Sequence, residues 1–454
     1  SSRSEANLIS YFAKASYTLD NKYTLDASIR ADASSKFGVD NRWGYFPSAG
    51  FTWRASEEKF IQNLNIFDEL KFRGSIGLSG NQNGIGPYAA LGLWSSGYNY
   101  LETAGTAPTQ LENRNLTWET TRQADIGVEF SILKKLLNFN IDFYNKYTYD
   151  LLLQVPTPSP TGFTSYLQNY GAVRNKGVEI AVTSNNVNTN DFSWTTTFNI
   201  SFNRNKIEKL ASDIALGASG RNVSILREGY AVNSFQLYKQ LYVDPQTGNA
   251  VYEDVNKDGG ITAADRQIVG NANPKYFGGL TNNITYKNFN LNFFLYFQQG
   301  NKIMNMRDFF LVHGGTQNFI GFIPRQLDRW QQPGDVTDIP RLTTYRGNIN
   351  ENGGAANNYG GQVASLSSRY LEDGSFLRLR NVSLSYNVPK SLYQALKIEN
   401  VRAYVQASNL FTVTNYKGLD PEVSAQSSNQ NTAGYDWATV PQPRTILVGL
   451  NVTF

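Results

Sequence analysis

The chain has 454 residues, which is enough for two or three soluble domains or for one large closed sheet. Its net charge of +4 is weak and no run of lysine and arginine reaches five residues, so nothing indicates a nucleic-acid partner. The lack of cysteine excludes disulfides and thiolate metal sites, and no stretch approaches the roughly 18 apolar residues of a membrane-spanning helix.

The composition favours strands with two different faces. Charged residues make up 17% of the chain and aromatic residues 13%, with 27 Tyr and 27 Phe. An ordinary globular protein carries about 25% charged residues. Few charges, many aromatics and abundant Asn, Ser, Thr and Gly suit a membrane β-barrel, in which one strand face meets lipid and the other meets water.

Apolar and polar residues alternate from the start of the chain. In "LISYFAKASYTL" every second residue from Ile9 to Leu19 is apolar, and the pattern resumes at Tyr23 after a turn at 20–22. This period of two lasts about ten residues, longer than the usual 5–6 of a soluble strand, with a large sandwich or propeller as the soluble alternative. Further strands are expected at 43–55, 70–80, 121–131, 136–149, 172–184, 192–204, 276–287, 289–299, 374–388, 400–411 and 443–454.

The connections alternate between short and long. Short ones are expected at 20–22, 134–136, 185–191, 287–288 and 389–400, and long ones at about 81–120, 150–171, 205–275, 300–373 and 412–442. Outer-membrane barrels have short periplasmic turns and long extracellular loops, so we expect the long segments to lie outside the cell. One further candidate strand, 234–244, breaks this rhythm and is expected inside the loop 205–275 as a hairpin above the membrane.

About 13 membrane strands result, an odd number. An unclosed sheet leaves backbone groups without partners in lipid, so we expect the chain to be the C-terminal portion (1–454) of a larger transmembrane antiparallel β-barrel. The last strand, "RTILVGLNVTF", ends on Phe454. A terminal aromatic on an alternating strand resembles the recognition signal of bacterial outer-membrane proteins.

Several longer stretches resemble one family, the SusC/RagA-type TonB-dependent transporters of the Bacteroidetes outer membrane. They include "LKFRGSIGLSGNQ" and "SNLFTVTNYKGLDPEV". The matching ranges, in order, are 30–60, 70–82, 116–130, 169–180, 270–291, 376–389 and 408–423.

The resemblance implies a plugged barrel of about 22 strands, a SusD-like surface lipoprotein as a lid, and uptake of oligosaccharides or peptides energised through TonB. The plug, the TonB box and some nine strands would then lie outside this chain. The longest loops, 205–275 and 300–373, are expected to contact the lid, in part through the Gly/Asn-rich segment 345–362. The runner-up function is a surface-exposed outer-membrane enzyme or adhesin on the same scaffold.

The segment "DVNKDGGITAAD" at 254–265 resembles the loop with which EF-hands bind calcium. Calcium would be held by six residues in one register: Asp254, Asn256, Asp258, Gly260, Thr262 and Asp265. Gly259 would allow the sharp turn, while an Asp at the closing position replaces the usual Glu. The alternative is a capping box from Thr262 to Asp265 with Asx turns before it.

Aromatic residues in the long loops are candidates for substrate contact, because sugar rings stack on such faces and peptides pack on them. They are Trp94, Tyr98, Tyr100, Trp330, Tyr345, Tyr359, Tyr370, Tyr435 and Trp437, and among them we single out Trp94, Tyr98, Trp330, Tyr435 and Trp437. The alternative is that they pack the loops together or form an aromatic belt.

Two further residue sets have structural explanations. Polar strand residues are expected to line a watery lumen: Asp26, Arg30, Glu129, Glu179, Arg378 and Arg380. The single histidine, His313, lies in "FFLVHGGTQN", and without a G-x-S-x-G elbow we expect a hydrogen-bonded or solvated loop residue rather than a catalyst. We therefore predict a multi-pass transporter component of a Gram-negative outer membrane that meets lipid on one face, with no catalytic residues.

Overall fold

The computed structural model describes residues 4–99, 101–218, 221–314, 320–343, 356–359, 361–393, 398–422 and 433–454. These residues form two compact units. Unit 1 comprises Ser1–Asn188, Trp194–Asp213 and Arg227–Tyr230, and unit 2 comprises Thr189–Ser193, Ile214–Leu226 and Ala231–Phe454. No helix in the described ranges is long and apolar enough to cross a membrane.

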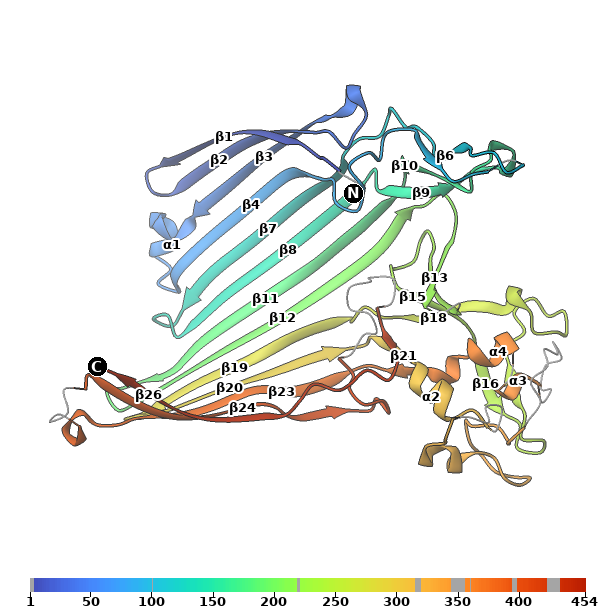
Figure 1. Cartoon of the computed structure of the whole chain (residues 1–454). Helices are drawn as coiled ribbons and strands as arrows, with labels where there is room; N and C mark the ends of the chain where they lie inside the picture. The colour runs from blue at the N-terminus through green and yellow to red at the C-terminus, as the bar shows by residue number, and fades with distance from the viewer. Residues whose placement is uncertain are drawn as a thin grey trace. The chain divides into compact units, whose positions relative to one another are not determined.

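A 13-stranded sheet has the strand order β1-β2-β3-β4-β7-β8-β11-β12-β19-β20-β23-β24-β26. Its strands in unit 1 lie side by side in chain order (Figure 1). They are β1 (Leu8–Leu19), β2 (Tyr23–Ser34), β3 (Trp43–Arg54), β4 (Phe67–Asn81), β7 (Glu119–Ile132), β8 (Leu137–Tyr149), β11 (Ala172–Asn188) and β12 (Phe192–Lys209). The predicted antiparallel sheet and its thirteen strands are confirmed.

Tight turns join neighbouring strands at one edge of unit 1. At 20–22, Asp20 and Asn21 have φ of 51° and 55°, and the Lys22 amide donates to the Leu19 carbonyl at 2.9 Å. Two positive φ values are typical of a type I′ turn, which matches the twist of a hairpin and suits Asp and Asn. The connections 55–66, with α1 (Lys59–Gln62), and 133–136 lie at the same edge.

The longer connections of unit 1 lie at the other edge and form small hairpins. These are β5 (Leu93–Ser96) with β6 (Thr106–Gln110), and β9 (Leu152–Pro156) with β10 (Ser165–Asn169). Phe37, Phe46 and Trp118 pack together beneath the first of these connections, and the Trp118 indole N–H donates to the Arg42 carbonyl at 2.9 Å.

The register gives the sheet of unit 1 one apolar and one polar face. Leu25 pairs with Tyr17 on one side and with Phe51 on the other, and all three side chains are exposed. The polar residue Asp26 pairs with Ser16 and Gly50 on the opposite face. We call these the apolar face and the polar face. An exposed apolar face of this extent is explained by lipid.

Unit 2 contains the other sheet strands and three long connections. The sheet strands are β19 (Tyr276–Tyr286), β20 (Phe289–Gln299), β23 (Phe376–Asn387), β24 (Asn400–Thr414) and β26 (Thr445–Thr453). The connections contain β13 (Ile214–Ala218), β14 (Arg221–Leu226), β15 (Ser234–Tyr238), β16 (Gln240–Val243), β17 (Ala250–Tyr252), β18 (Arg266–Asn271), β21 (Lys302–Asn305), α2 (Met306–Leu311), α3 (Ala356–Tyr359), α4 (Gly361–Ser365), β22 (Leu371–Asp373) and β25 (Tyr435–Asp436).

The long connections of unit 2 fold into a body with a core of its own. Strands β13, β14, β15 and β18 form one sheet, and β16 pairs with β17. Buried residues from distant parts of the chain meet here, among them Phe235, Tyr252, Met304 and Tyr435. The segment 234–244 therefore lies outside the 13-stranded sheet, as predicted, although β15 joins a four-stranded sheet and only β16 forms the predicted kind of hairpin.

Candidate functional site

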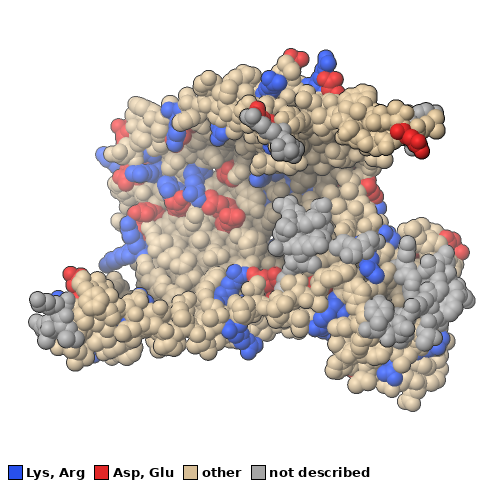
Figure 2. Space-filling model, in the orientation of Figure 1, with Lys and Arg blue, Asp and Glu red and all other residues tan. Residues whose placement is uncertain are grey.

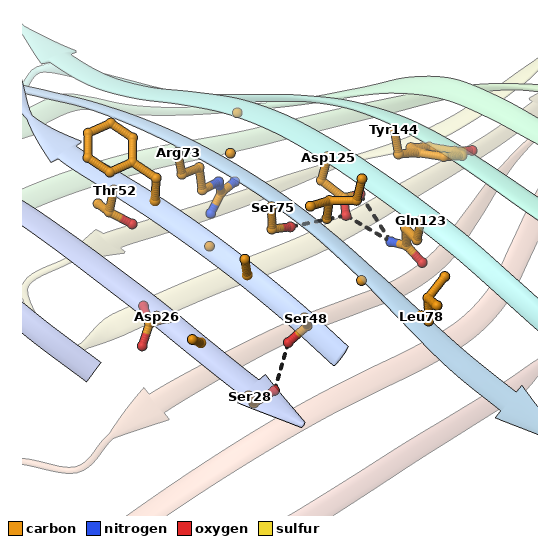
Figure 3. Close-up of a pocket in the computed structure, with 18 of the residues that line it drawn as sticks. Asp26, Ser28, Ser48, Thr52, Arg73, Ser75, Leu78, Gln123, Asp125 and Tyr144 are labelled. Atoms are coloured by element: carbon orange, nitrogen blue, oxygen red, sulfur yellow. Dashed lines mark hydrogen bonds between the residues drawn. The ribbon is translucent and has the colours of Figure 1, made fainter. Parts of the chain in front are cut away.

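The polar face of unit 1 is hollowed into a cavity of about 980 Å³. Seven strands line it, from β1 to β11, and each contributes short or polar side chains (Figure 3). The polar and charged lining residues are Lys14, Asp26, Ser28, Ser48, Thr52, Arg73, Ser75, Ser79, Gln123, Asp125, Asp142, Tyr144, Lys146 and Glu179.

Hydrogen bonds hold several of these side chains against the wall of the cavity. The Ser28 and Ser48 hydroxyls lie 2.7 Å apart across β2 and β3, as the dashed line in Figure 3 marks. On β7 the Gln123 amide donates to Asp125 at 3.0 Å, and the Ser75 hydroxyl of β4 reaches the same carboxylate at 3.3 Å. The wall is therefore rich in donors and acceptors, and short side chains leave the centre open.

An ion-pair network crosses three strands beside this cavity. Arg73 on β4 donates to Glu129 on β7 at 2.6 Å and to Asp142 on β8 at 2.6 Å, and also to Asn140 on β8 at 2.8 Å. Lys71 pairs with the same Glu129. Basic and acidic side chains gather side by side on this part of the molecule (Figure 2).

A glycine makes the network possible. Arg73, Gly127 and Asp142 occupy one row across β4, β7 and β8. A Cβ at Gly127 would lie 2.4 Å from the Arg73 Nε and 2.5 Å from the Asp142 Oδ1, so any other residue would push these groups apart. The arginine can reach over the middle strand because that strand has no side chain there.

The network also separates the first cavity from a second hollow of about 610 Å³ on the same face. Arg73 and Asp142 line the first, whereas Lys71, Glu129 and Asn140 line the second. The side chains of the four charged residues are each about one third exposed, between 29% and 36%. They thus present fixed charges of both signs to a solute on this face.

The residues predicted to line the lumen lie in different environments. Asp26 and Glu179 line the first cavity, and Glu129 belongs to the network. Arg30 pairs with Asp32 at 2.7 Å. The expectation that Arg378 lines water is wrong.

Arg378 is buried because the connection that follows β24 covers it. Its guanidinium pairs with Asp420 and with Glu422, and its side chain is only 3% exposed. Arg380 also pairs with Glu422 but is about one third exposed and lies over the Tyr296 ring at 4.1 Å.

The loop aromatics divide by exposure. Trp94 and Tyr98 are 67% and 54% exposed in the connection 82–118, so substrate contact stays a prediction for them. Trp330 is partly buried and donates its indole N–H to the Pro245 carbonyl at 2.9 Å. Trp437 packs on Phe310 with ring centres 5.3 Å apart.

The other tyrosines among these candidates support the loops. Tyr435 is completely buried, and Tyr359 and Tyr370 are buried as well. Burial raises the pKa of Tyr359 and of Tyr435 to about 12. Tyr100 and Tyr345 lie outside the described residues, as does most of the segment 345–362.

Acidic side chains of the loop 254–265 accept hydrogen bonds from groups of the same loop. Thr262 and Asp265 form a capping box around a 3-10 turn at Ala263–Asp265. Asp254 accepts from the amides of Lys257 and Gly259 at 2.7 and 2.9 Å, and Asp258 from that of Gly260 at 2.9 Å. The bond to Asp258 is an Asx turn of the alternative interpretation, whereas the bonds to Asp254 come from three and five residues further along.

The Asp265 carboxylate at the end of this loop is fully buried. Burial alone would raise its pKa, but the amides of Thr262 and Val255 donate to it at 2.7 and 2.9 Å and lower the pKa overall. Among the residues described, no three His, Cys, Asp or Glu side chains converge as metal ligands. Calcium binding by Asp254, Asn256, Asp258, Gly260, Thr262 and Asp265 therefore stays a prediction.

His313 has a structural environment. Its ring is buried, stacks on Phe322 at 4.4 Å, and its Nε2 lies 3.1 Å from the Ile320 carbonyl oxygen. This agrees with a hydrogen-bonded loop histidine.

Comparison with known proteins identifies the fold family. The family described as TonB dependent receptor-like, beta-barrel, matches residues 1–410. TonB-dependent receptor P3 of Formosa agariphila is 32% identical over 99% of this chain and 46% of its own length. TonB-dependent receptor SusC of Bacteroides thetaiotaomicron is 30% identical over 98% of this chain and 44% of its own length.

Among solved structures, the RagAB peptide importer in the closed-closed state matches with a TM-score of 0.83 and 27% identity. The match covers 98% of this chain and 48% of that one. The chain thus spans about half the length of the relatives it matches. It belongs to the TonB-dependent receptor β-barrel family, whose members lie in the outer membrane.

Proposed function

We propose that this chain is part of the wall of an outer-membrane nutrient importer, and that its polar face lines the path of a short polar oligomer, an oligosaccharide or a peptide. The cavity of about 980 Å³ on that face carries the proposal. Its lining mixes apolar residues with many hydrogen-bonding side chains, and its charges of both signs are partly neutralised within the wall. Such a wall suits passage better than tight retention of one ligand.

One solved relative is titled a peptide importer, which supports import. Another relative is named TonB-dependent receptor SusC. Energy from TonB would enter through a part of the transporter that this chain does not contain, since the plug and the TonB box are expected elsewhere.

A SusD-like lipoprotein would dock on the long connections of unit 2. Supporting this, several large apolar side chains there are exposed to solvent: Leu241, Tyr242, Val255, Phe322, Leu327, Val336 and Leu342. Val336 is 90% exposed, and it is the grouping of such side chains on one body that supports a docking surface. Contact with a partner would remove this surface from water.

A matched pair of substitutions tests the path. Ser75 on β4 lines the cavity, whereas Ile126 on the neighbouring strand β7 belongs to the apolar face and does not line it. Ser75→Trp should fill part of the cavity and lower uptake of a fluorescent oligosaccharide or peptide pool by whole cells. Ile126→Trp should leave uptake near that of the wild type.

The same cells distinguish import from the alternatives. Uptake through this wall should disappear in a strain without TonB. Accumulation that persists without TonB, or equal uptake by the two tryptophan variants, would contradict the proposal and favour a surface enzyme or an adhesin.

A further inference from the structure

The apolar face of unit 1 changes character on four neighbouring strands. On β7, β8, β11 and β12 it carries rows of apolar side chains that end at Ile126, Phe143, Val178 and Phe202. Beyond these rows, towards the long connections, the same face turns basic. The basic residues at these positions are Arg122, Arg174, Lys176, Arg204 and Lys206, and Lys209 at the end of β12 lines the same hollow as Arg122.

The register places these residues together. Arg122 pairs with Tyr147, which in turn pairs with Arg174, and Lys176 lies one row closer to the apolar band. Arg174 donates to Glu208 on β12 at 3.1 Å, so the even positions of β12 lie on this face as well. The four strands are neighbours in the sheet (Figure 1).

The patch is preorganised and strongly positive. The Arg174 guanidinium lies over the Tyr147 ring at 4.6 Å and also donates to Asn145 at 3.2 Å. Lys209 lies over the Tyr170 ring at 4.4 Å. Only two carboxylates, Asp150 and Glu208, stand against the six basic residues, which leaves a formal excess of four positive charges.

A hollow of about 430 Å³ lies within the patch. Its walls are Arg122, Tyr147, Tyr149, Asp150, Gly171, Ala172 and Lys209. The apolar face of strands β1 to β4 carries no lysine or arginine, so among these described strands the patch is a local feature and not a ring around the wall.

The position of the patch along the strands shows which layer of the membrane surrounds it. The apolar row on β8 runs from Leu137 to Phe143, a rise of about 15 Å at about 3.3 Å per residue and a tilt near 40°, and by the same measure Tyr147 lies about 25 Å from Leu137 along the barrel axis. The apolar band of an outer-membrane barrel is about 25 Å tall and bordered by aromatic residues. Tyr147 and Tyr149 therefore lie at the level of the lipid headgroups, and so do the cations around them.

We propose that this patch binds the phosphorylated headgroup of a glycolipid in the outer leaflet, of the lipid A class. Arginine and lysine pair strongly with phosphate, and an arginine held on a tyrosine ring loses little further freedom on binding. Basic pockets at a membrane boundary recognise anionic headgroups for the same reason. The acyl chains would lie along the apolar rows below, and the hollow beside Arg122 would receive part of the headgroup.

The test measures which lipids the transporter retains. The complete transporter is reconstituted in nanodiscs of phosphatidylcholine with a small fraction of lipid A, with lipid A lacking its phosphates, or with phosphatidylglycerol. After extraction and purification in mild detergent, mass spectrometry gives the retained lipid relative to its fraction in the bilayer. We expect enrichment of lipid A only, weakened at high salt.

Three variants locate the site. Lys176→Gln with Lys206→Gln should lower the enrichment by roughly tenfold, because both charges are lost at the headgroup level. Lys176→Arg with Lys206→Arg should retain it. Lys14→Gln with Lys146→Gln, which removes the same charge from the polar face, should change nothing.

Equal retention by the glutamine variant and the wild type would overturn the proposal, and so would absence of enrichment in the wild type. Enrichment of the lipid without phosphates, or equal enrichment of phosphatidylglycerol, would show that phosphate on a glycolipid is not what is recognised. Heat-modified migration on gels shows whether the glutamine variant folds. If it does not fold, the salt dependence of wild-type retention decides instead. None of these readouts depends on uptake.

Discussion

Removing the charge of Arg378 should destabilise the connection that leads into β26. The guanidinium donates to Thr412 at 2.9 Å and to Glu422 at 2.8 Å, and it pairs with Asp420. The side chains of Arg378 and Asp420 are 3% and 4% exposed. Arg378→Met would leave the Asp420 carboxylate buried without its cation, a change that costs about 3–5 kcal/mol in the free energy of unfolding.

The lower end of that range is expected, because Asp420 keeps two other partners. The Glu422 and Gln442 amides donate to its two oxygens at 2.9 and 3.0 Å. Asp420→Asn should cost less, about 1.5–3 kcal/mol, since Arg378 would still pair with Glu422. The double variant should cost less than the sum of the two single changes by about 1–3 kcal/mol.

Urea unfolding followed by tryptophan fluorescence measures these differences, and Trp437 in the same connection reports on the local structure. Arg380→Met is the matched control. Its side chain is 34% exposed, so its pair with Glu422 should contribute at most about 1 kcal/mol. A loss below about 1 kcal/mol for Arg378→Met, or additive effects in the double variant, would refute the reasoning, since buried partners must couple.

Three further predictions concern other parts of the molecule. Gly127→Ala should displace the ion pairs that cross it and change uptake, while the free energy of unfolding shifts by less than about 1 kcal/mol because partly exposed pairs contribute little. Gly74→Ala is the control, because a Cβ there meets only one atom at 3.8 Å. Equal uptake by the two variants would contradict the expectation. Millimolar calcium should protect the loop 254–265 from proteolysis. Asp258→Asn should abolish the protection, because that carboxylate lies outside the capping box. Equal cleavage with calcium or chelator would favour the capping box alone. Tyr359 and Tyr435 have a pKa of about 12 in the folded protein against about 10 when unfolded. Their contribution to the free energy of unfolding is therefore fully present below pH 10 and should fall between pH 10 and 12, by about 1.4 kcal/mol per pH unit for each. Phenylalanine variants should flatten that slope in alkaline unfolding curves.

The strands of the large sheet could be predicted because apolar and polar residues alternate over about ten residues in each. The run 289–299 coincides with β20, and the run 172–184 lies within the longer β11. A long alternation leaves little doubt about which residues share a face. The short strands of the loops carry no such signal, since β16 and β17 span only 240–243 and 250–252.

Alternation predicts which face a side chain occupies but not what covers it. Arg378 and Asp26 both occupy polar positions in alternating strands. Asp26 lines an open cavity, whereas Arg378 is enclosed by Asp420 and Glu422, which lie about forty residues further along the chain. Tyr435 is similar, because its burial depends on Phe235 and other residues two hundred positions away. Burial of this kind depends on tertiary contacts that the local pattern does not contain.

The ion-pair network shows what the sequence could still reveal. Arg73 and Asp142 are 69 residues apart, and each looks like any other charged strand residue until the register is known. Once β4, β7 and β8 are taken as neighbours, Gly127 becomes the informative residue, because a glycine inside a strand needs a reason. Here a side chain from an adjacent strand occupies the space above it, and the same holds at Gly177, where a Cβ would lie 2.5 Å from the Tyr144 hydroxyl. At Gly127 and Gly177 a glycine on the polar face therefore marks a place where a long side chain reaches across the wall.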